Sequence, residues 1–187
     1  MGYQIPQKTL DRLFSFTGPF EGSIPHLYLD TQGFVTVGIG FLLPTLEAAK
    51  KIGMEPPDKI EADWNAVTAA PKARVASFYK QFTSCTLPQD VLKVEFNRRI
   101  QEFANYLYPT YDLANYPEDA VVAILDMAYN LGAGALLKKW PKFKAACQAR
   151  DWQTASTQCV RKGVQGSSDF RGSRLQLCSA PHLPTAV

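Results

Sequence analysis

The chain has 187 residues, of which 46% are hydrophobic, and a formal net charge of +3 at pH 7. This length and composition can bury a full core and suit one domain with two lobes. The mild positive charge favours approach to anionic polymers. The sequence has no Lys/Arg-rich run, zinc-finger spacing or stacked aromatic platform, so we expect no nucleic-acid binding.

The N-terminal segment predicts a short helix over residues 6–16. Apolar residues recur there at helical spacing, and a proline stands near the start. Gly18 and Pro19 follow and predict a break in the helix. Glu21 is therefore expected after the helix, beyond that break.

Residues 27–43 predict a β-hairpin. They alternate loosely, are rich in Val, Ile, Phe and Tyr, and carry turn residues over 30–33. Asp30 then lies at the turn, and Thr36 lies on the returning strand.

Glu21 and Asp30 form a candidate catalytic pair for glycoside hydrolysis. That reaction takes one carboxylic acid to protonate the leaving oxygen and a second carboxylate to activate water or attack the sugar. A cleft between a helix end and a hairpin can hold one acid in drier surroundings while the other stays solvated. The structural alternative is that Asp30 only stabilises its turn, because Asp side chains often bond local backbone there.

Two helices are expected in the segment that follows. Asp58 with Glu61 three residues later resembles a capping box ahead of a helix over residues 59–69. A second short helix is expected over residues 71–82.

The longest periodic segment, residues 88–107, predicts a long helix. Its apolar face is formed by Val91, Leu92, Val94, Phe96, Ile100, Phe103 and Leu107. Later helices are expected to begin at Pro117, at Pro141 and, with Asp151 as the cap, at Trp152. Helices after one early hairpin predict an α+β architecture that is mostly α.

Residues 120–137 form an apolar run that approaches membrane-spanning length. The run contains Asp126, Asn130 and glycines, so a buried core helix is the better interpretation. The N-terminus has neither the charged nor the apolar region of a secretory signal. We therefore expect no membrane span and no export by such a signal.

The four cysteines fit neither a Cys-x-x-Cys pair nor a common metal spacing, so no metal site is expected. They are Cys85, Cys147, Cys159 and Cys178. A disulfide between Cys147 and Cys159 is predicted if the chain reaches an oxidising space, since a short turn joins the helices expected to carry them. Buried thiols are the alternative, because Cys also behaves as a small hydrophobe.

Four runs of residues resemble the phage-type lysozyme family of the T-even phages and related endolysins. The first, over residues 21–40, is Glu-Gly followed by Tyr-x-Asp-x-x-Gly-x-x-Thr-x-Gly-x-Gly. Residues 123–132 (AILDMAYNLG) resemble the core helix of the family's C-lobe. Residues 150–152 (RDW) resemble a later helix start, and residues 169–174 (DFRGSR) a basic segment near the C-terminus.

The resemblance implies a lysozyme-like two-lobed fold within one catalytic domain over residues 1–187. It places a small β-hairpin N-lobe over about 18–87, a linking helix over about 88–107, and a helical C-lobe over about 108–180 packed with N-terminal helix 6–16. Residues 44–87 lie outside the resemblance and exceed the length usual in the family. We expect a solvated helical insertion there; a wall of the cleft is the alternative.

Carried over residue by residue, the resemblance implies that Glu21 is the general acid, that Asp30 activates water and that Thr36 helps place that water. It implies no cofactor. Leu42, Tyr129 and Asn130 are implied as substrate contacts, and Arg171 or Arg174 as the charge partner of Glu21. Family members often carry His where this chain has Phe41, so the ion pair that such a His supports is not expected.

The implied activity is that of an inverting endo-N-acetylmuramidase, which cleaves the β-1,4 bond between N-acetylmuramic acid and N-acetylglucosamine of bacterial peptidoglycan and lyses the cell. A non-catalytic wall-binding module and a glycosidase of chitin or chitosan are the alternatives. The enzyme would act as a monomer at the cell wall, in the periplasm of the target cell. A holin, a secretion machinery or a larger carrier protein would deliver it, and an immunity protein is a further partner of such a role.

Overall fold

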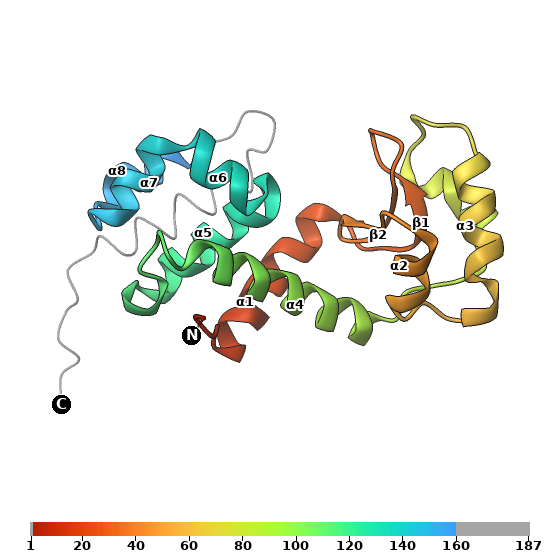
Figure 1. Cartoon of the computed structure of the whole chain (residues 1–187), viewed down its shortest axis with the longest axis horizontal. Coiled ribbons are helices and arrows are strands. Elements are labelled where there is room, and N and C mark those ends of the chain that lie inside the picture. Colours follow the sequence, from red (N-terminus) through yellow and green to blue (C-terminus); the bar gives the residue numbers. More distant parts are fainter. Residues whose placement is uncertain (1, 160–187) are drawn as a thin grey trace. The chain divides into compact units, whose positions relative to one another are not determined.

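The computed structural model describes residues 2–159, without the side chains of residues 16 and 18–21. The chain divides into two compact units. Within the described residues, one unit contains 2–13 with 98–159, and the other contains 14–97. The divisions fall inside two helices, α1 (Gln7–Glu21) and α4 (Gln89–Leu107), which therefore contribute residues to both units (Figure 1).

The unit of residues 14–97 is built on a three-stranded antiparallel sheet. Its strands are β1 (Ile24–Leu29), β2 (Val35–Gly38) and β3 (Phe41–Leu42), in that spatial order. Gly33 in the β1–β2 turn and Gly40 in the β2–β3 turn both have a φ of 84°, which glycine adopts without strain. The predicted hairpin is confirmed, with β3 as an additional short strand.

The segment after the sheet supplies much of this unit's core. It forms α2 (Leu46–Lys51), the 3₁₀ helix η1 (Pro57–Lys59), α3 (Ile60–Ala69) and the 3₁₀ helix η2 (Ala76–Phe82). Both α3 and η2 pack against β1, as Figure 1 shows. The buried residues of this segment include Ala49, Met54, Ile60, Val67, Tyr79, Cys85 and Leu87. The expectation of a solvated insertion over residues 44–87 is therefore wrong.

Asp63 on α3 fixes the chain that leads from η2 toward α4. Its side chain is 5% exposed, and Oδ2 accepts the backbone N–H groups of Ser84 and Cys85 at 2.8 and 2.7 Å. Oδ1 accepts the Ser84 hydroxyl at 3.0 Å. A buried carboxylate is tolerated here because three donors replace its water.

Two helix starts in this unit differ from expectation. Asp58 lies inside η1 and does not cap α3, whose N-cap position is Lys59 with no side-chain bond. The reason is the preceding Pro56-Pro57 pair: Pro56 is extended and Pro57 begins the 3₁₀ turn, so Asp58 lacks the extended backbone of an N-cap. In the predicted helix over 71–82, only the seven residues of η2 are helical, in the 3₁₀ form.

Helix α1 is longer than predicted, because it continues through Gly18 and Pro19 to Glu21. A proline inside a helix removes one N–H donor, and its ring crowds the carbonyl four residues earlier as well as the N–H and Cβ of the residue before it. Here that residue is glycine and has no Cβ, so the last turn can form. Glu21 therefore ends the helix instead of following a break.

The other unit is helical. The second half of α4 is followed by the 3₁₀ helix η3 (Leu113–Asn115), α5 (Glu118–Leu131), α6 (Ala133–Lys139), α7 (Pro141–Gln148) and α8 (Trp152–Gln158). Pro141 occupies the first position of α7, and Asp151 caps α8 by accepting the Thr154 N–H at 3.0 Å. Both predicted starts are confirmed. Figure 1 shows α7 beside α8, which pack together.

Helix α5 forms the centre of this unit, since every residue from Ala120 to Ala128 is buried. Within residues 2–159 no single helix is long and apolar enough to cross a membrane. Helices α5 and α6 pass that test of length and composition only as a pair, bent by 100°.

The first half of α1 is attached to the start of α5. The Thr9 hydroxyl donates to Glu118 Oε1 at 2.8 Å, and Arg12 forms ion pairs with Glu118 at 2.9 Å and Asp119 at 2.7 Å. Burial raises the pKa of Glu118. The Thr9 hydroxyl and the charges of Arg12 and Lys8 lower it by more than burial raises it, so the pKa lies below its ordinary value. Residues 90 or more positions apart in sequence thus meet in one unit.

Helix α4 covers 19 residues and confirms the predicted long helix. Leu92, Phe96, Ile100 and Leu107 are buried as expected. Val94, which was expected on the apolar face, is 69% exposed, because it lies two residues from both Leu92 and Phe96 and so points away from their face.

Cys147 on α7 and Cys159 at the end of α8 are both buried thiols, and the structure has no disulfide between them. The Cys159 thiol donates to the Ser156 carbonyl at 3.1 Å. The predicted pair is therefore not bonded in this structure, although its helices do pack together. Cys178 lies outside the described residues.

Candidate active site

Asp30 closes the β1–β2 turn with its own carboxylate. Oδ1 accepts the backbone N–H groups of Gln32 and Phe34, both at 2.9 Å, and the Asp30 N–H donates to the Phe34 carbonyl at 2.9 Å. These bonds fix the side chain and occupy one oxygen. No donor among the described residues bonds Oδ2, so that oxygen can receive a water or a sugar hydroxyl.

Thr36 lies on β2, the middle strand, and is 3% exposed. Its hydroxyl donates to the Phe34 carbonyl at 3.2 Å. A hydroxyl has one hydrogen and two lone pairs. Because the hydrogen is directed to Phe34, the Thr36 oxygen is left as an acceptor.

The strand register places Thr36 and Leu42 on one face of the sheet. Thr36 pairs with Tyr28 across β1 and with Leu42 across β3. Directly paired residues point to the same side, and neighbours along a strand point to opposite sides. The other face is apolar and buried, and it carries Leu27, Leu29, Val35, Val37 and Phe41.

Glu21 is the last residue of α1, and Gly22 follows it with a φ of 71°. Glycine at this position is a common way to end a helix, because the left-handed backbone costs it nothing. The two acids therefore come from different elements, a helix end and a hairpin turn, as expected. The side chain of Glu21 is not among those described, so its distance from the Asp30 carboxyl stays a prediction.

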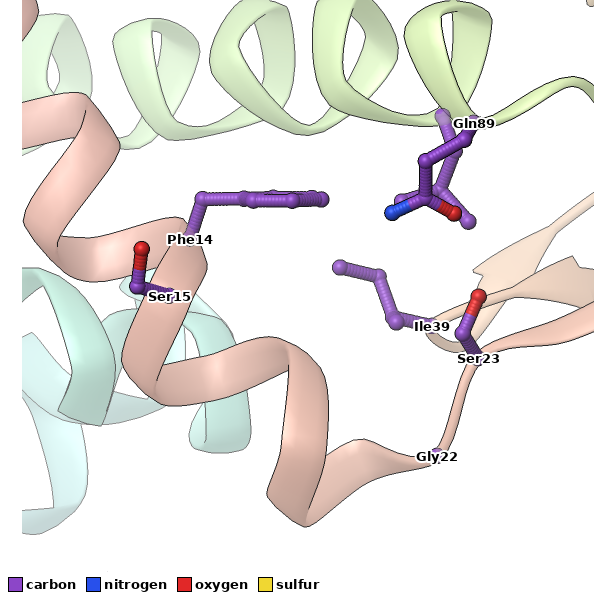
Figure 2. Close-up of a pocket in the computed structure, with 7 residues that line it drawn as sticks. Phe14, Ser15, Gly22, Ser23, Ile39 and Gln89 are labelled. Carbon is purple, nitrogen blue, oxygen red and sulfur yellow. The ribbon is translucent and has the colours of Figure 1, made fainter.

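A cavity of about 390 Å³ opens beside the end of α1, within the unit of residues 14–97 (Figure 2). Figure 2 shows the Phe14 ring and the Ile39 side chain directed into this space, with the Ser23 hydroxyl and the Gln89 amide at its edge. The full lining is Phe14, Ser15, Gly22, Ser23, Ile39, Gln89 and Leu92. The residues that directly follow Glu21 thus border a mainly apolar space.

Phe41 occupies the position where the resemblance expects His. Its side chain is completely buried, and a Cβ at Gly38 would lie only 3.0 Å from Phe41 Cδ2. Gly38, with a φ of 67°, therefore allows both the tight turn and the close approach of this ring. Phe41 therefore contributes to the buried core beneath the sheet.

Two predicted substrate contacts, Tyr129 and Asn130, belong to the other unit. The Asn130 amide donates to the Asp126 carbonyl at 3.0 Å, within α5, and the Tyr129 ring packs edge-on against Phe103 at 6.4 Å between centroids. Their role toward a substrate stays a prediction. Arg171 and Arg174, the predicted charge partners of Glu21, lie outside the described residues.

No group of three or more His, Cys, Asp and Glu side chains that could hold a metal ion occurs in the described part of the chain. His26 is 7% exposed, and its Nε2 lies 3.0 Å from the Ala76 carbonyl at the start of η2. This histidine thus connects β1 to η2.

Comparison with known proteins shows the fold. No protein-family model and no curated protein sequence matches the chain. Among solved structures, the chain is similar to the active form of the P1 phage endolysin Lyz, with a TM-score of 0.50 and 15% sequence identity over 91% of this chain and 83% of that chain. The mostly helical architecture with its small antiparallel sheet is therefore a lysozyme-like α+β fold, as predicted.

Phe34 is a residue of the candidate site that was not predicted. In the sequence it is part of a β-rich run, and in the structure its backbone bonds both Asp30 and Thr36. Its position directly after the turn, opposite the acid in the hairpin, was the available signal.

Proposed function

We propose that this chain is a cell-wall glycoside hydrolase, an endo-N-acetylmuramidase that cleaves the β-1,4 bond between N-acetylmuramic acid and N-acetylglucosamine in peptidoglycan. One observation carries the proposal. The Asp30 carboxylate and the Thr36 hydroxyl are both held by the backbone of Phe34, at one end of the hairpin in a lysozyme-like fold.

The first proposed step is activation of a water molecule. A water between Asp30 and Thr36 would donate one hydrogen bond to Asp30 Oδ2 and the other to the Thr36 oxygen. Its lone pair is then free to attack the anomeric carbon, while Asp30 takes the proton. The bonds from Phe34 and Gln32 keep Asp30 in place during this step.

The second proposed step is protonation of the leaving oxygen by Glu21. The C-terminal end of a helix carries partial negative charge, which favours the neutral form of a carboxylic acid over the carboxylate. The cavity that Gly22 and Ser23 line is also bordered by Phe14, Ile39 and Leu92, and a carboxyl group that entered such apolar surroundings would favour the neutral form as well. A neutral Glu21 is the form that can act as the acid.

We propose that the reaction inverts the anomeric configuration. In that case the carboxyl groups of Glu21 and Asp30 lie about 6.5 to 9.5 Å apart, which leaves room for the water. A separation near 5 Å would instead support a covalent glycosyl intermediate.

We further propose that Leu42, Tyr129 and Asn130 contact the glycan and that Arg171 or Arg174 is the charge partner of Glu21, stabilising the carboxylate that remains once the proton has been given up. The enzyme would act on the wall from the periplasm of the target cell, after delivery by a holin, a secretion machinery or a larger carrier protein. An immunity protein in the producing cell would fit such a role.

The proposal is tested by the release of soluble fragments from purified peptidoglycan. Glu21→Gln should lose at least about a hundredfold in turnover, because the amide cannot protonate the leaving oxygen. Glu55→Gln, an exposed glutamate of the same unit, is the matched control and should keep full turnover. Thermal unfolding of all three proteins should coincide.

Substantial turnover by Glu21→Gln would show that Glu21 is not the acid. Binding to peptidoglycan without any product from the wild-type chain would support a wall-binding module. Products from chitin or chitosan alone would identify another aminosugar polymer as the substrate.

A further inference from the structure

Phe34 exposes an aromatic ring at the end of the hairpin. Its side chain is 53% exposed, whereas Val35 and Val37, which follow on β2, are 6% and 0% exposed. A single exposed apolar side chain needs no explanation, since much of any protein surface is apolar. What matters for Phe34 is where the strand register and the backbone bonds place it.

The register puts Phe34 on the face that carries Asp30 and Thr36. Tyr28 pairs with Thr36, and continuing the antiparallel register by two residues sets Asp30 opposite Phe34. The 2.9 Å bond from the Asp30 N–H to the Phe34 carbonyl agrees with that pairing. Leu42, which pairs with Thr36 and is 44% exposed, lies on the same face.

The backbone of Phe34 is held at both of its polar groups. Its N–H donates to Asp30 Oδ1, and its carbonyl accepts the Asp30 N–H and the Thr36 hydroxyl. The base of the ring is therefore fixed relative to the two polar groups proposed to activate water. A residue ordered before binding loses little further entropy when a ligand contacts it.

We propose that the Phe34 ring is a sugar-binding platform, which packs against the C–H face of a pyranose ring of the glycan next to Asp30, with Leu42 extending the apolar contact. The inference rests on the proposed function and names a residue that positions its substrate. A pyranose ring has an apolar C–H face and polar edges, and ligand sites combine aromatic surfaces with a few fixed polar groups in the same way. Asp30 and Thr36 supply the polar groups here.

The test compares Phe34→Ala and Phe34→Trp with wild type on soluble, uncross-linked peptidoglycan strands. Because the ring contacts the sugar equally before and during bond cleavage, its loss should raise KM and leave kcat unchanged. We expect Phe34→Ala to raise KM roughly three- to tenfold. Phe34→Trp keeps an aromatic face and should stay within about twofold of the wild-type KM.

Val75→Ala is the matched control. Val75 is 73% exposed and belongs to the same unit, but it lies at the N-cap of η2 and not on the hairpin. This variant should leave both kinetic constants unchanged. An unchanged KM for Phe34→Ala, or a fall in kcat at unchanged KM, would overturn the platform.

A binding measurement separates this inference from the proposed function. Glu21→Gln and the double variant Glu21→Gln with Phe34→Ala are each incubated with insoluble peptidoglycan, and the bound fraction is measured. Weaker binding by the double variant supports the platform even if the wild-type chain releases no product, an outcome that would contradict only the hydrolase. Equal binding by the two variants contradicts the platform.

Discussion

Asp30 and Phe34 are joined by two hydrogen bonds of 2.9 Å, one from the Phe34 N–H to the Asp30 carboxylate and one from the Asp30 N–H to the Phe34 carbonyl. The acid proposed to activate water is thus also the residue that closes its own turn. The structural and the catalytic interpretations of Asp30 are compatible, because each uses a different carboxylate oxygen.

Two substitutions of Asp30 should separate those uses. Asp30→Asn keeps an oxygen that can accept the Gln32 and Phe34 N–H groups, but it has no base, so turnover should fall at least about a hundredfold with little change in stability. Asp30→Ala removes the bonds as well and should lower the free energy of unfolding by about 1 to 3 kcal/mol. Urea unfolding beside the fragment-release assay checks both results. Full turnover by Asp30→Asn would rule out its role as the base.

Asp63 should contribute far more stability than Asp58, although both carry the same charge. Asp63→Ala leaves the N–H groups of Ser84 and Cys85 without their acceptor in a buried place, which should cost about 2 to 4 kcal/mol. Asp58 is exposed and caps no helix, so Asp58→Ala should change stability by less than about 0.5 kcal/mol. Equal decreases in the free energy of unfolding for the two variants, measured by urea unfolding, would contradict the conclusion that Asp58 caps no helix.

Glu118 should contribute to the free energy of unfolding at neutral pH, and this contribution should be lost as the pH is lowered. The pKa of Glu118 is lower in the folded chain than its ordinary value of 4.5, so folding is favoured above pH 4.5, where the carboxylate is charged. That contribution is lost as the pH falls through the lowered folded pKa. Glu118→Gln should therefore be less stable than wild type at pH 7, and the difference should shrink toward pH 3. A difference independent of pH would exclude the ion pairs with Arg12 and Lys8 as its cause.

Cys85 should react very slowly with thiol reagents in the folded protein, even at mildly alkaline pH, because its side chain is buried. Burial and the nearby Asp63 carboxylate raise the pKa of Cys85 to about 12, so almost no thiolate exists at pH 8. In denaturant without reductant, thiol labelling should modify Cys85, Cys147 and Cys159. Labelling of Cys147 and Cys159 only after reduction would show that the predicted disulfide forms after all.

Much of the fold could be predicted from the sequence where local chemistry decides it. The hairpin around residues 30–33, the long helix α4, and the starts of α7 at Pro141 and α8 after Asp151 follow from turn residues, periodicity and caps. Each of these signals lies within a few residues of the feature it predicts.

The features that were predicted wrongly depend on neighbouring residues or on packing. The continuation of α1 past Pro19 is helped by the missing Cβ of Gly18, and Asp58 does not act as a cap because Pro56 and Pro57 precede it. The core role of residues 44–87 depends on packing between α3, η2 and β1, which no local pattern shows. The expectation of a solvated insertion rested on the general tendency of insertions to lie at the surface.

In the candidate site, too, local sequence patterns predicted some features and not others. The positions of Asp30 at the hairpin turn and Thr36 on the returning strand could be predicted from the sequence, whereas their catalytic roles stay a prediction. Phe34 was not predicted, since its backbone bonds to both residues and the exposure of its ring are seen only in the structure. Its position opposite Asp30, directly after the turn, was the one local signal.

The central claim is tested most directly by mass spectrometry of purified peptidoglycan digested with the wild-type chain and with Glu21→Gln, following the reducing-end sugar of each released fragment. The account predicts N-acetylmuramic acid at the reducing end of the wild-type products and no such products from Glu21→Gln. Fragments that end in N-acetylglucosamine, or equal products from both proteins, would contradict it.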